Sequence, residues 1–159
     1  MANQPESVER VVLAGTELGL SVEVIEYPDG TRTAVDAANA VGCDVGQIVK
    51  SLIFSIDDEL VLALTSGANM VDTEALTSLA EGHACGRANA DLVRETTGYA
   101  IGGVPPFGHT TKVRSFFDPA LLHWSEVWAA AGTPRHVFRL DPQALLSATG
   151  ALVGDFAQK

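Results

Sequence analysis

Apolar positions near the N-terminus recur at helical spacing and predict a helix over residues 8–18, which Ser7 caps and Gly19 ends. A strand over 22–27 and a turn at 28–30 follow. Most later helical segments begin with a residue that can cap them. These predicted helices cover residues 33–41, 44–48, 73–80, 90–96 and 142–150.

The clearest strand signal is a pair of apolar runs at 51–56 and 60–65, which flank three acidic residues and predict a β-hairpin. Because both runs are largely apolar, we expect burial on both faces. Shorter strands are predicted over 99–101, 112–117, 126–131 and 136–140. Strands and helices alternate irregularly, so we expect a mixed α/β fold, a curved mixed sheet or barrel surrounded by helices.

Length and composition predict one domain over residues 1–159. Hydrophobic residues make up 47% and charged residues 19%, which is typical of a globular chain. No apolar run approaches the roughly 20 residues of a membrane span, and the N-terminus lacks a signal-peptide pattern. Cys43 and Cys85 form no disulfide framework. We therefore expect a soluble, cytoplasmic protein without a membrane partner.

The formal net charge of −10 argues against a nucleic-acid partner, but its distribution weakens that argument. Residues 1–100 hold five basic and 16 acidic residues, whereas residues 101–159 hold five basic and four acidic residues. The basic side chains that could face phosphates are Lys112, Arg114, Arg135 and Arg139. No helix rich in Lys and Arg is present, so DNA binding is not expected.

The strongest local motif is the loop at 102–108. Gly102 and Gly103 permit close backbone approach, and Pro105 with the next proline makes the loop rigid. Main-chain N–H groups held in fixed directions can bind a carbonyl or an oxyanion. The more common structure for such a pattern is an ordinary tight turn between strands.

Lys50 lies where a buried strand begins, and there it could neutralise a phosphate or a carbonyl oxygen. A solvated lysine at a strand end is the alternative. His109 follows the glycine-proline loop and could reach a ligand, and His136 begins a strand, although neither has a partner evident in sequence. No zinc spacing, nucleophile elbow or nucleotide-binding glycine motif occurs. No metal or cofactor is therefore expected.

Three segments, at 48–54, 62–65 and 97–108, resemble the YbaK/prolyl-tRNA synthetase-associated editing domains in order and spacing. The resemblance extends from about residue 8 to 157, and the chain looks like a freestanding member. It implies a mixed, barrel-like α/β fold. It also implies hydrolysis of the ester that joins an amino acid to the 3′ end of tRNA, with no metal.

The resemblance also assigns residues. Lys50 matches the family lysine that contacts the substrate carbonyl or terminal phosphate region, and Gly102, Gly103 and Pro105 match the loop that holds the terminal adenosine and aminoacyl group. Ser51 stands where some members have Asn or Thr, at a position that shapes the aminoacyl pocket. We take Lys50 and Gly103 as catalytic candidates. The substrate-binding candidates are Ser51, Thr65, Gly102, Val104, Pro105, His109 and His136.

These expectations predict a trans-editing deacylase that removes small amino acids (Ala, Cys, Ser, Thr or 2-aminobutyrate) from mischarged tRNA, with tRNA for proline as the expected substrate and prolyl-tRNA synthetase as a further partner. An aminoacyl ester is already activated, so a positioned water can attack it while Lys50 and the loop amides stabilise the oxyanion. We expect the terminal ribose hydroxyl to assist that water. The alternative is a catalytically silent module of the same fold that binds aminoacyl-tRNA or a nucleotide.

Overall fold

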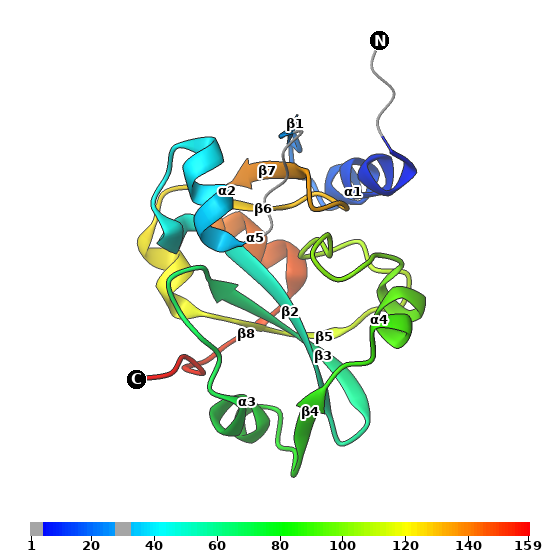
Figure 1. Ribbon diagram of the computed structural model, residues 1–159, viewed down its shortest axis with the longest axis vertical. Helices are drawn as coiled ribbons and strands as arrows, with labels where there is room; N and C mark the ends of the chain where they lie inside the picture. The colour runs from blue at the N-terminus through cyan, green and yellow to red at the C-terminus, as the bar shows by residue number, and fades with distance from the viewer. Residues whose placement is uncertain (1–4, 28–32) are drawn as a thin grey trace.

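The computed structural model describes residues 5–27 and 33–159, and the turn predicted at 28–30 lies outside these residues (Figure 1). The helices are α1 (Glu6–Glu17), α2 (Ala34–Val41), η1 (Val45–Gln47), α3 (Thr73–Leu79), α4 (Ala90–Thr97), η2 (Pro119–His123) and α5 (Pro142–Thr149). The strands are β1 (Val24–Glu26), β2 (Val49–Ile56), β3 (Glu59–Ser66), β4 (Cys85–Arg87), β5 (Arg114–Phe117), β6 (Val127–Ala130), β7 (His136–Leu140) and β8 (Leu152–Val153).

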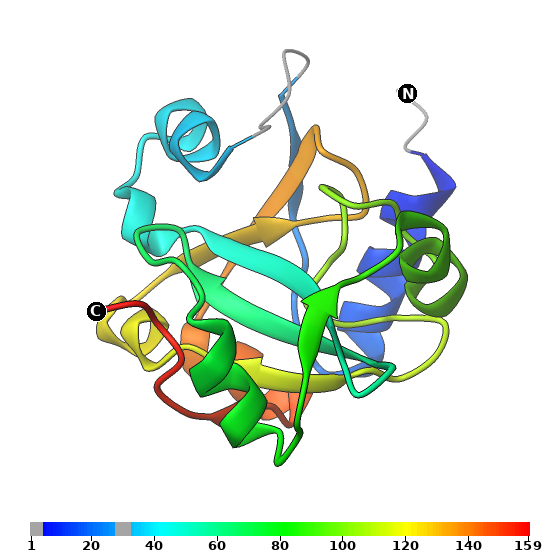
Figure 2. The same ribbon diagram turned by 60° about the horizontal axis from the view of Figure 1, so that its bottom comes forward.

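The strands form two sheets. The first has the order β4-β2-β3-β5-β8 and the second β1-β7-β6. β2 and β3 form the predicted antiparallel hairpin, whereas β3–β5 and β5–β8 pair in parallel. A parallel bridge, Ile48 to Trp128, connects the residue before β2 to β6 of the second sheet. Helices lie around the outside of the strands (Figure 2), so the predicted mixed α/β architecture is confirmed.

β3 is buried along its length because it separates two cores. Leu62 and Leu64 pack in the larger core with Phe138, whereas Val61 and Ala63 pack in a second core. Burial on both faces is therefore confirmed for β3. It is wrong for β2, whose side chains from residue 50 to 55 are only half-buried.

Local sequence signals predicted most element ends. The caps Thr33, Asp44, Asp72 and Asp141 each accept a backbone N–H of the helix that follows. Ser7 is not a cap, because α1 begins one residue earlier, after Pro5, with no side-chain cap. The short elements β4, β8 and η2 were not predicted, since two to five residues carry too little periodicity.

The strand predicted at 99–101 is wrong, because this segment is a turn. Gly98 ends α4 with a φ of 85°, and the buried Thr97 hydroxyl accepts the N–H of Tyr99. The Gly103 N–H then donates to the Ala100 carbonyl at 3.0 Å. These bonds bend the chain immediately after the helix and leave no extended stretch to pair.

His109 fixes the segment that follows this turn. Its Nε2 lies 2.7 Å from the Pro105 carbonyl oxygen, and because a carbonyl can only accept, Nε2 carries the proton. Burial lowers the pKa of His109, and the hydrogen bond to Pro105 opposes that effect. The imidazole therefore holds the proline segment as a donor.

The lowered pKa of His109 predicts an acid-labile fold. The unfolded state binds more protons than the folded state below the ordinary value of 6.5, so stability is complete above that pH and falls as the pH drops through it. The amide of Gln can still donate to Pro105 but does not titrate. We therefore expect the free energy of unfolding of His109→Gln to fall less than that of the wild type as the pH drops. Urea unfolding between pH 7.5 and 5.5 measures it, with His123→Gln, at an exposed histidine, as the control. Parallel curves for wild type and His109→Gln would contradict the assignment.

Candidate functional site

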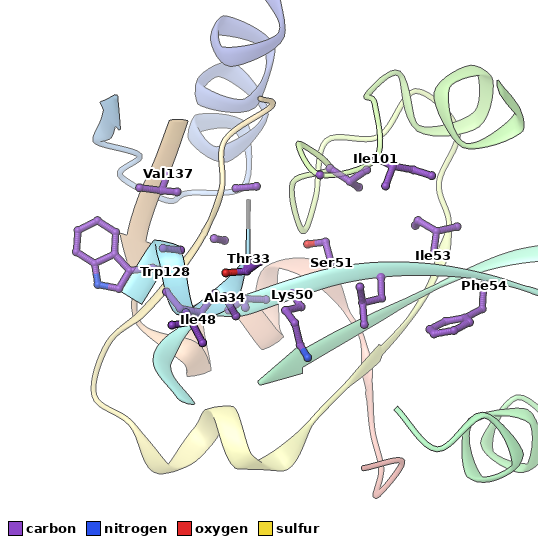
Figure 3. A pocket seen from close by; sticks show the side chains of 18 of the residues that line it. Thr33, Ala34, Ile48, Lys50, Ser51, Ile53, Phe54, Ile101, Trp128 and Val137 are labelled. Carbon is purple, nitrogen blue, oxygen red and sulfur yellow. The ribbon is translucent and has the colours of Figure 1, made fainter. Parts of the chain in front are cut away.

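A cleft of about 810 Å³ opens beside the bridge between Ile48 and Trp128. β2 forms one wall, α2 and β6 form another, and the turn at 101–104 closes the far end (Figure 3). This volume is within the range of roughly 300–1,000 Å³ of small-molecule sites. Most of the side chains that line the cleft are aliphatic or aromatic.

The cleft exists because part of the β2 edge has no partner strand. β4 pairs only with Phe54–Ile56 of β2, and the bridge to β6 lies before the strand, at Ile48. Between these points, over residues 50–53, no neighbouring strand pairs with this edge in the described part of the chain. The edge contributes side chains from both faces of β2 to the cleft.

Ser51 brings an unpaired polar group into this mainly apolar cavity. Its hydroxyl points toward the turn that carries Ile101 (Figure 3). The Oγ atom is buried and has no hydrogen-bond partner among residues 5–27 and 33–159. An unsatisfied buried hydroxyl costs about 1–3 kcal/mol, so this group is placed to bind a polar atom of a ligand.

Lys50 projects from the opposite side of β2 (Figure 3), because adjacent residues of a strand alternate between its faces. Its Nζ donates to the carbonyl of Asn69. Burial lowers the pKa of the Lys50 ammonium, and the negative charge of Asp118 raises it. Lys50 and Ser51 thus line one cleft and present a positive charge and a hydroxyl in different directions.

The glycine turn faces β2 across the cleft through Gly102 and Val104. Gly102 has a φ of 94°, which favours glycine. A Cβ on Gly103 would lie 2.8 Å from the Thr133 Cα, so Gly103 allows the turn to pack directly on another main chain. The Gly103 N–H is occupied within the turn. In the described chain, the N–H groups of Ile101, Gly102 and Val104 have no protein acceptor, and Gly102 and Val104 are candidate donors within the glycine turn.

The other predicted site residues do not line the cleft. Thr65 pairs with Lys50 across the hairpin, but its side chain is fully buried and donates to the Ala63 carbonyl. Pro105 is buried behind the turn, where its carbonyl accepts a hydrogen bond from His109 Nε2. Substrate contacts by these three predicted residues stay predictions.

His136 is buried at the start of β7, next to the cleft residue Val137. Its Nδ1 lies 2.6 Å from the Thr133 hydroxyl, and its Nε2 lies 3.4 Å from a Glu26 carboxylate oxygen. Thr133 is also the residue on which Gly103 packs. His136 therefore supports the wall behind the glycine turn, and a direct contact with substrate stays a prediction.

Sequence reasoning missed the other walls of the cleft. Small and branched residues of α2, including Ala34 and Ala37, form one side, and Trp128–Ala130 of β6 continue it. Arg87 of the unpredicted β4 lies near the outer end. The alanine-rich composition of α2 was the one available signal, because small side chains leave room for a ligand.

Residues 5–27 and 33–159 contain neither a metal-binding cluster nor a membrane-spanning helix. No group of three or more His, Cys, Asp or Glu side chains is arranged to hold a metal ion there. No helix in these ranges is long and apolar enough to cross a membrane.

Known proteins resemble this chain in sequence. A profile of the aminoacyl-tRNA editing domain matches residues 28–148. The uncharacterized protein YwhH of Bacillus subtilis (strain 168) is 28% identical over 124 residues, which are 77% of this chain and 78% of YwhH. The proline–tRNA ligase of Maridesulfovibrio salexigens is 30% identical over 102 residues, which are 64% of this chain and 17% of the ligase. The chain thus spans a small part of that ligase.

Solved structures show the same fold. A protein described as a candidate trans-editing enzyme for prolyl tRNA synthetase has a TM-score of 0.93 and 46% identity, and the match covers 99% of this chain and 100% of that one. A hypothetical protein has a TM-score of 0.84 and 28% identity, with coverage of 96% and 100%. These matches confirm the resemblance carried by the lysine strand and the glycine-proline loop. Because the family profile covers well over half of its length, this chain belongs to the aminoacyl-tRNA editing domain family.

Proposed function

We propose that this protein is a deacylase that acts in trans on mischarged tRNA and hydrolyses the ester of a small amino acid. One observation carries the proposal: the unpaired Ser51 hydroxyl points into an apolar cleft of about 810 Å³, opposite a glycine turn. Membership of the editing domain family supports this function. The similarity to a candidate trans-editing enzyme supports prolyl-tRNA synthetase as the enzyme whose errors are corrected.

The lining of the cleft suits a small aminoacyl group. Ala34, Ala37 and Val41 of α2 offer apolar contacts, and Ser51 offers a single hydroxyl. A synthetase pocket discriminates against a missing methylene by only about 1–3 kcal/mol, so a synthetase for proline mischarges smaller amino acids. A second pocket that excludes proline by size can remove these errors.

The chemistry requires little from side chains. Water adds to the ester carbonyl carbon, the bond to the terminal ribose oxygen breaks, and the products are a free amino acid and the tRNA hydroxyl. No histidine or carboxylate is among the described residues that line the cleft, which supports assistance of the water by the second ribose hydroxyl. In the proposal, the Gly102 and Val104 N–H groups stabilise the oxyanion.

Lys50 supplies one of the two positive charges among the described residues that line the cleft, and Arg87 supplies the other. The position of Lys50 bears on its role. In the structure its ammonium is bonded to the Asn69 carbonyl, on the other side of β2 from Ser51 (Figure 3). From there it can bind a terminal phosphate directly, whereas contact with the ester carbonyl requires it to leave Asn69. The same observation favours the second candidate, a silent module that holds aminoacyl-tRNA or a nucleotide without hydrolysis.

A deacylation panel tests the function. Purified protein is mixed with tRNA for proline that carries alanine, 2-aminobutyrate, serine, threonine or cysteine, and prolyl-tRNA serves as the control. We expect release of one or more small amino acids above the spontaneous rate, with prolyl-tRNA spared. Tight binding of the same tRNAs without any release would support the silent module instead.

Removing the ammonium tests the role of Lys50. We expect Lys50→Ala to fold and to lose most deacylation, by about 10²–10³-fold in kcat if the charge acts on the oxyanion. If the charge binds a phosphate, KM rises and kcat is nearly unchanged. Lys112→Ala, at an exposed lysine outside the cleft, is the matched control. Wild-type kinetics in Lys50→Ala would show that the Lys50 charge is not required for deacylation.

Gly103 tests the packing of the turn. We expect Gly103→Val to displace the turn from Thr133, to lower the free energy of unfolding by about 1–3 kcal/mol and to reduce deacylation. Gly86→Val is the matched control, since a Cβ there meets nothing within 4 Å. Chemical denaturation and steady-state kinetics measure both effects. If both valine variants behave like the wild type, the close approach of the turn is unimportant.

Ser51 tests the polar contact in the cleft. Because its hydroxyl is unsatisfied, we expect Ser51→Ala to keep or raise the melting temperature. We also expect hydrolysis of seryl- and threonyl-tRNA to fall about tenfold relative to alanyl-tRNA, the effect of about one hydrogen bond. The deacylation panel measures the ratio. An equal loss on all substrates would assign the hydroxyl to the shared α-amino group, and no loss would remove Ser51 from the site.

A further inference from the structure

Lys50 is connected to a buried carboxylate through one intermediate residue. The Lys50 ammonium donates to the main-chain carbonyl of Asn69. The side-chain amide of the same Asn69 donates to Asp118 Oδ2 at 2.9 Å. Asn69 thus contacts the lysine with its backbone and the carboxylate with its side chain, so the position of one group depends on the other.

Asp118 is held firmly at the start of η2. It is 2% exposed, and its two oxygens accept the N–H groups of Ser66 and Ala120 at 3.0 and 2.9 Å. No cation within ion-pair distance of Asp118 occurs among residues 5–27 and 33–159. A buried carboxylate whose charge is balanced only by neutral donors is costly, so its charge acts on the nearest cation it can reach.

The loop that carries Asn69 is clamped from both sides. The Asn69 N–H donates to the Ser66 carbonyl at 2.9 Å. Beyond it, the Met70 carbonyl accepts the Gln158 N–H at 2.8 Å, and Val71 bridges to Ala157 near the C-terminus. The carbonyl that receives the Lys50 ammonium is therefore a fixed point rather than a freely moving loop atom.

We infer that Asp118 and Asn69 are positioning residues that aim the Lys50 ammonium along β2 and keep its positive charge available for the tRNA end. This inference rests on the deacylase function proposed above. Neither residue lines the cleft, so both act through Lys50. The pair explains why a buried carboxylate is placed behind a cationic residue of a mainly apolar site.

The electrostatics agree with this geometry. Burial lowers the pKa of Lys50, and the charge of Asp118 is what raises it again. Arg87 of β4 is the other charged side chain among the described residues that line the cleft, and its like charge cannot help to keep Lys50 protonated. Loss of the Asp118 charge should therefore lower the pKa of Lys50.

The test compares two matched aspartates. Asp118 and Asp141 each cap a helical turn that has proline at its first position, and each is changed to Asn. The chain has three lysines, Lys50, Lys112 and Lys159, so ¹³C labelling at lysine Cε allows the titration of Lys50 to be followed by NMR, with Lys50→Met to assign it. Deacylation of alanyl-tRNA is measured at pH 7.5 and 9 with the spontaneous rate subtracted.

We expect Asp118→Asn to lower the pKa of Lys50 and to reduce kcat/KM about ten- to a hundredfold, with the larger loss at pH 9. Asp141→Asn should change neither. Asn69→Ala keeps the main-chain carbonyl that binds Lys50 but loses the side-chain amide that binds Asp118. It should also reduce kcat/KM, and it provides the test if Asp118→Asn does not fold.

An unchanged Lys50 titration together with wild-type turnover, in Asp118→Asn or in Asn69→Ala, would overturn the inference while the deacylase function stands. If the wild type hydrolyses none of the aminoacyl-tRNAs in the deacylation panel, the proposed function fails. The NMR titration still decides whether Asp118 controls the charge of Lys50.

Discussion

The site depends on one junction between the two sheets, at Ile48. Its carbonyl accepts the Gly67 N–H at 2.7 Å, its N–H donates to Val45, and a parallel bridge connects it to Trp128 of β6. Gly67 is required there, because a Cβ would lie 2.4 Å from the Val45 carbonyl. Among residues 5–27 and 33–159, β2 and β6 do not pair beyond this bridge, so β2 continues with an open edge. The cleft lies along this open edge of β2.

The open edge also explains how two neighbouring residues have different tasks. In a strand covered on both faces, Lys50 and Ser51 would be directed into separate cores, and a lysine there would be expensive to bury. At an edge, both side chains still reach the same cavity while they point to opposite sides of β2. The hydroxyl then faces the glycine turn, and the ammonium rests against the Asn69 loop. Under the proposed function, consecutive residues can in this way bind a polar ester end and an anionic nucleotide end.

Local chemistry made the hairpin, most caps and the glycine turn predictable from sequence. The apolar runs of β2 and β3 lie on either side of a tight acidic turn. Asp72 and Asp141 each mark the start of a helix, because each accepts a backbone N–H of that helix. What could not be predicted is set by distant contacts. The walls from α2 and β6, the open edge of β2 and the link from Asp118 to Lys50 join residues that are far apart in sequence. Residues 99–101 were misassigned for a local reason, since Thr97 and Gly98 override their apolar pattern.

The histidines show how support and contact differ in this site. His109 and His136 were expected near substrate, and in the structure each is bonded to protein: His109 to the Pro105 carbonyl, and His136 to Thr133. Their contact with substrate stays a prediction. The two bonds act on opposite sides of one interface, because Gly103 of the turn packs on the backbone of Thr133. A deacylase that relies on water and main-chain donors has no strong nucleophile that could compensate for poor alignment. Small displacements of the donors therefore lower the rate of hydrolysis. Rigid anchoring of the turn is thus a requirement of the proposed chemistry, and the hydrogen bonds of the half-buried His109 and the buried His136 contribute to that anchoring.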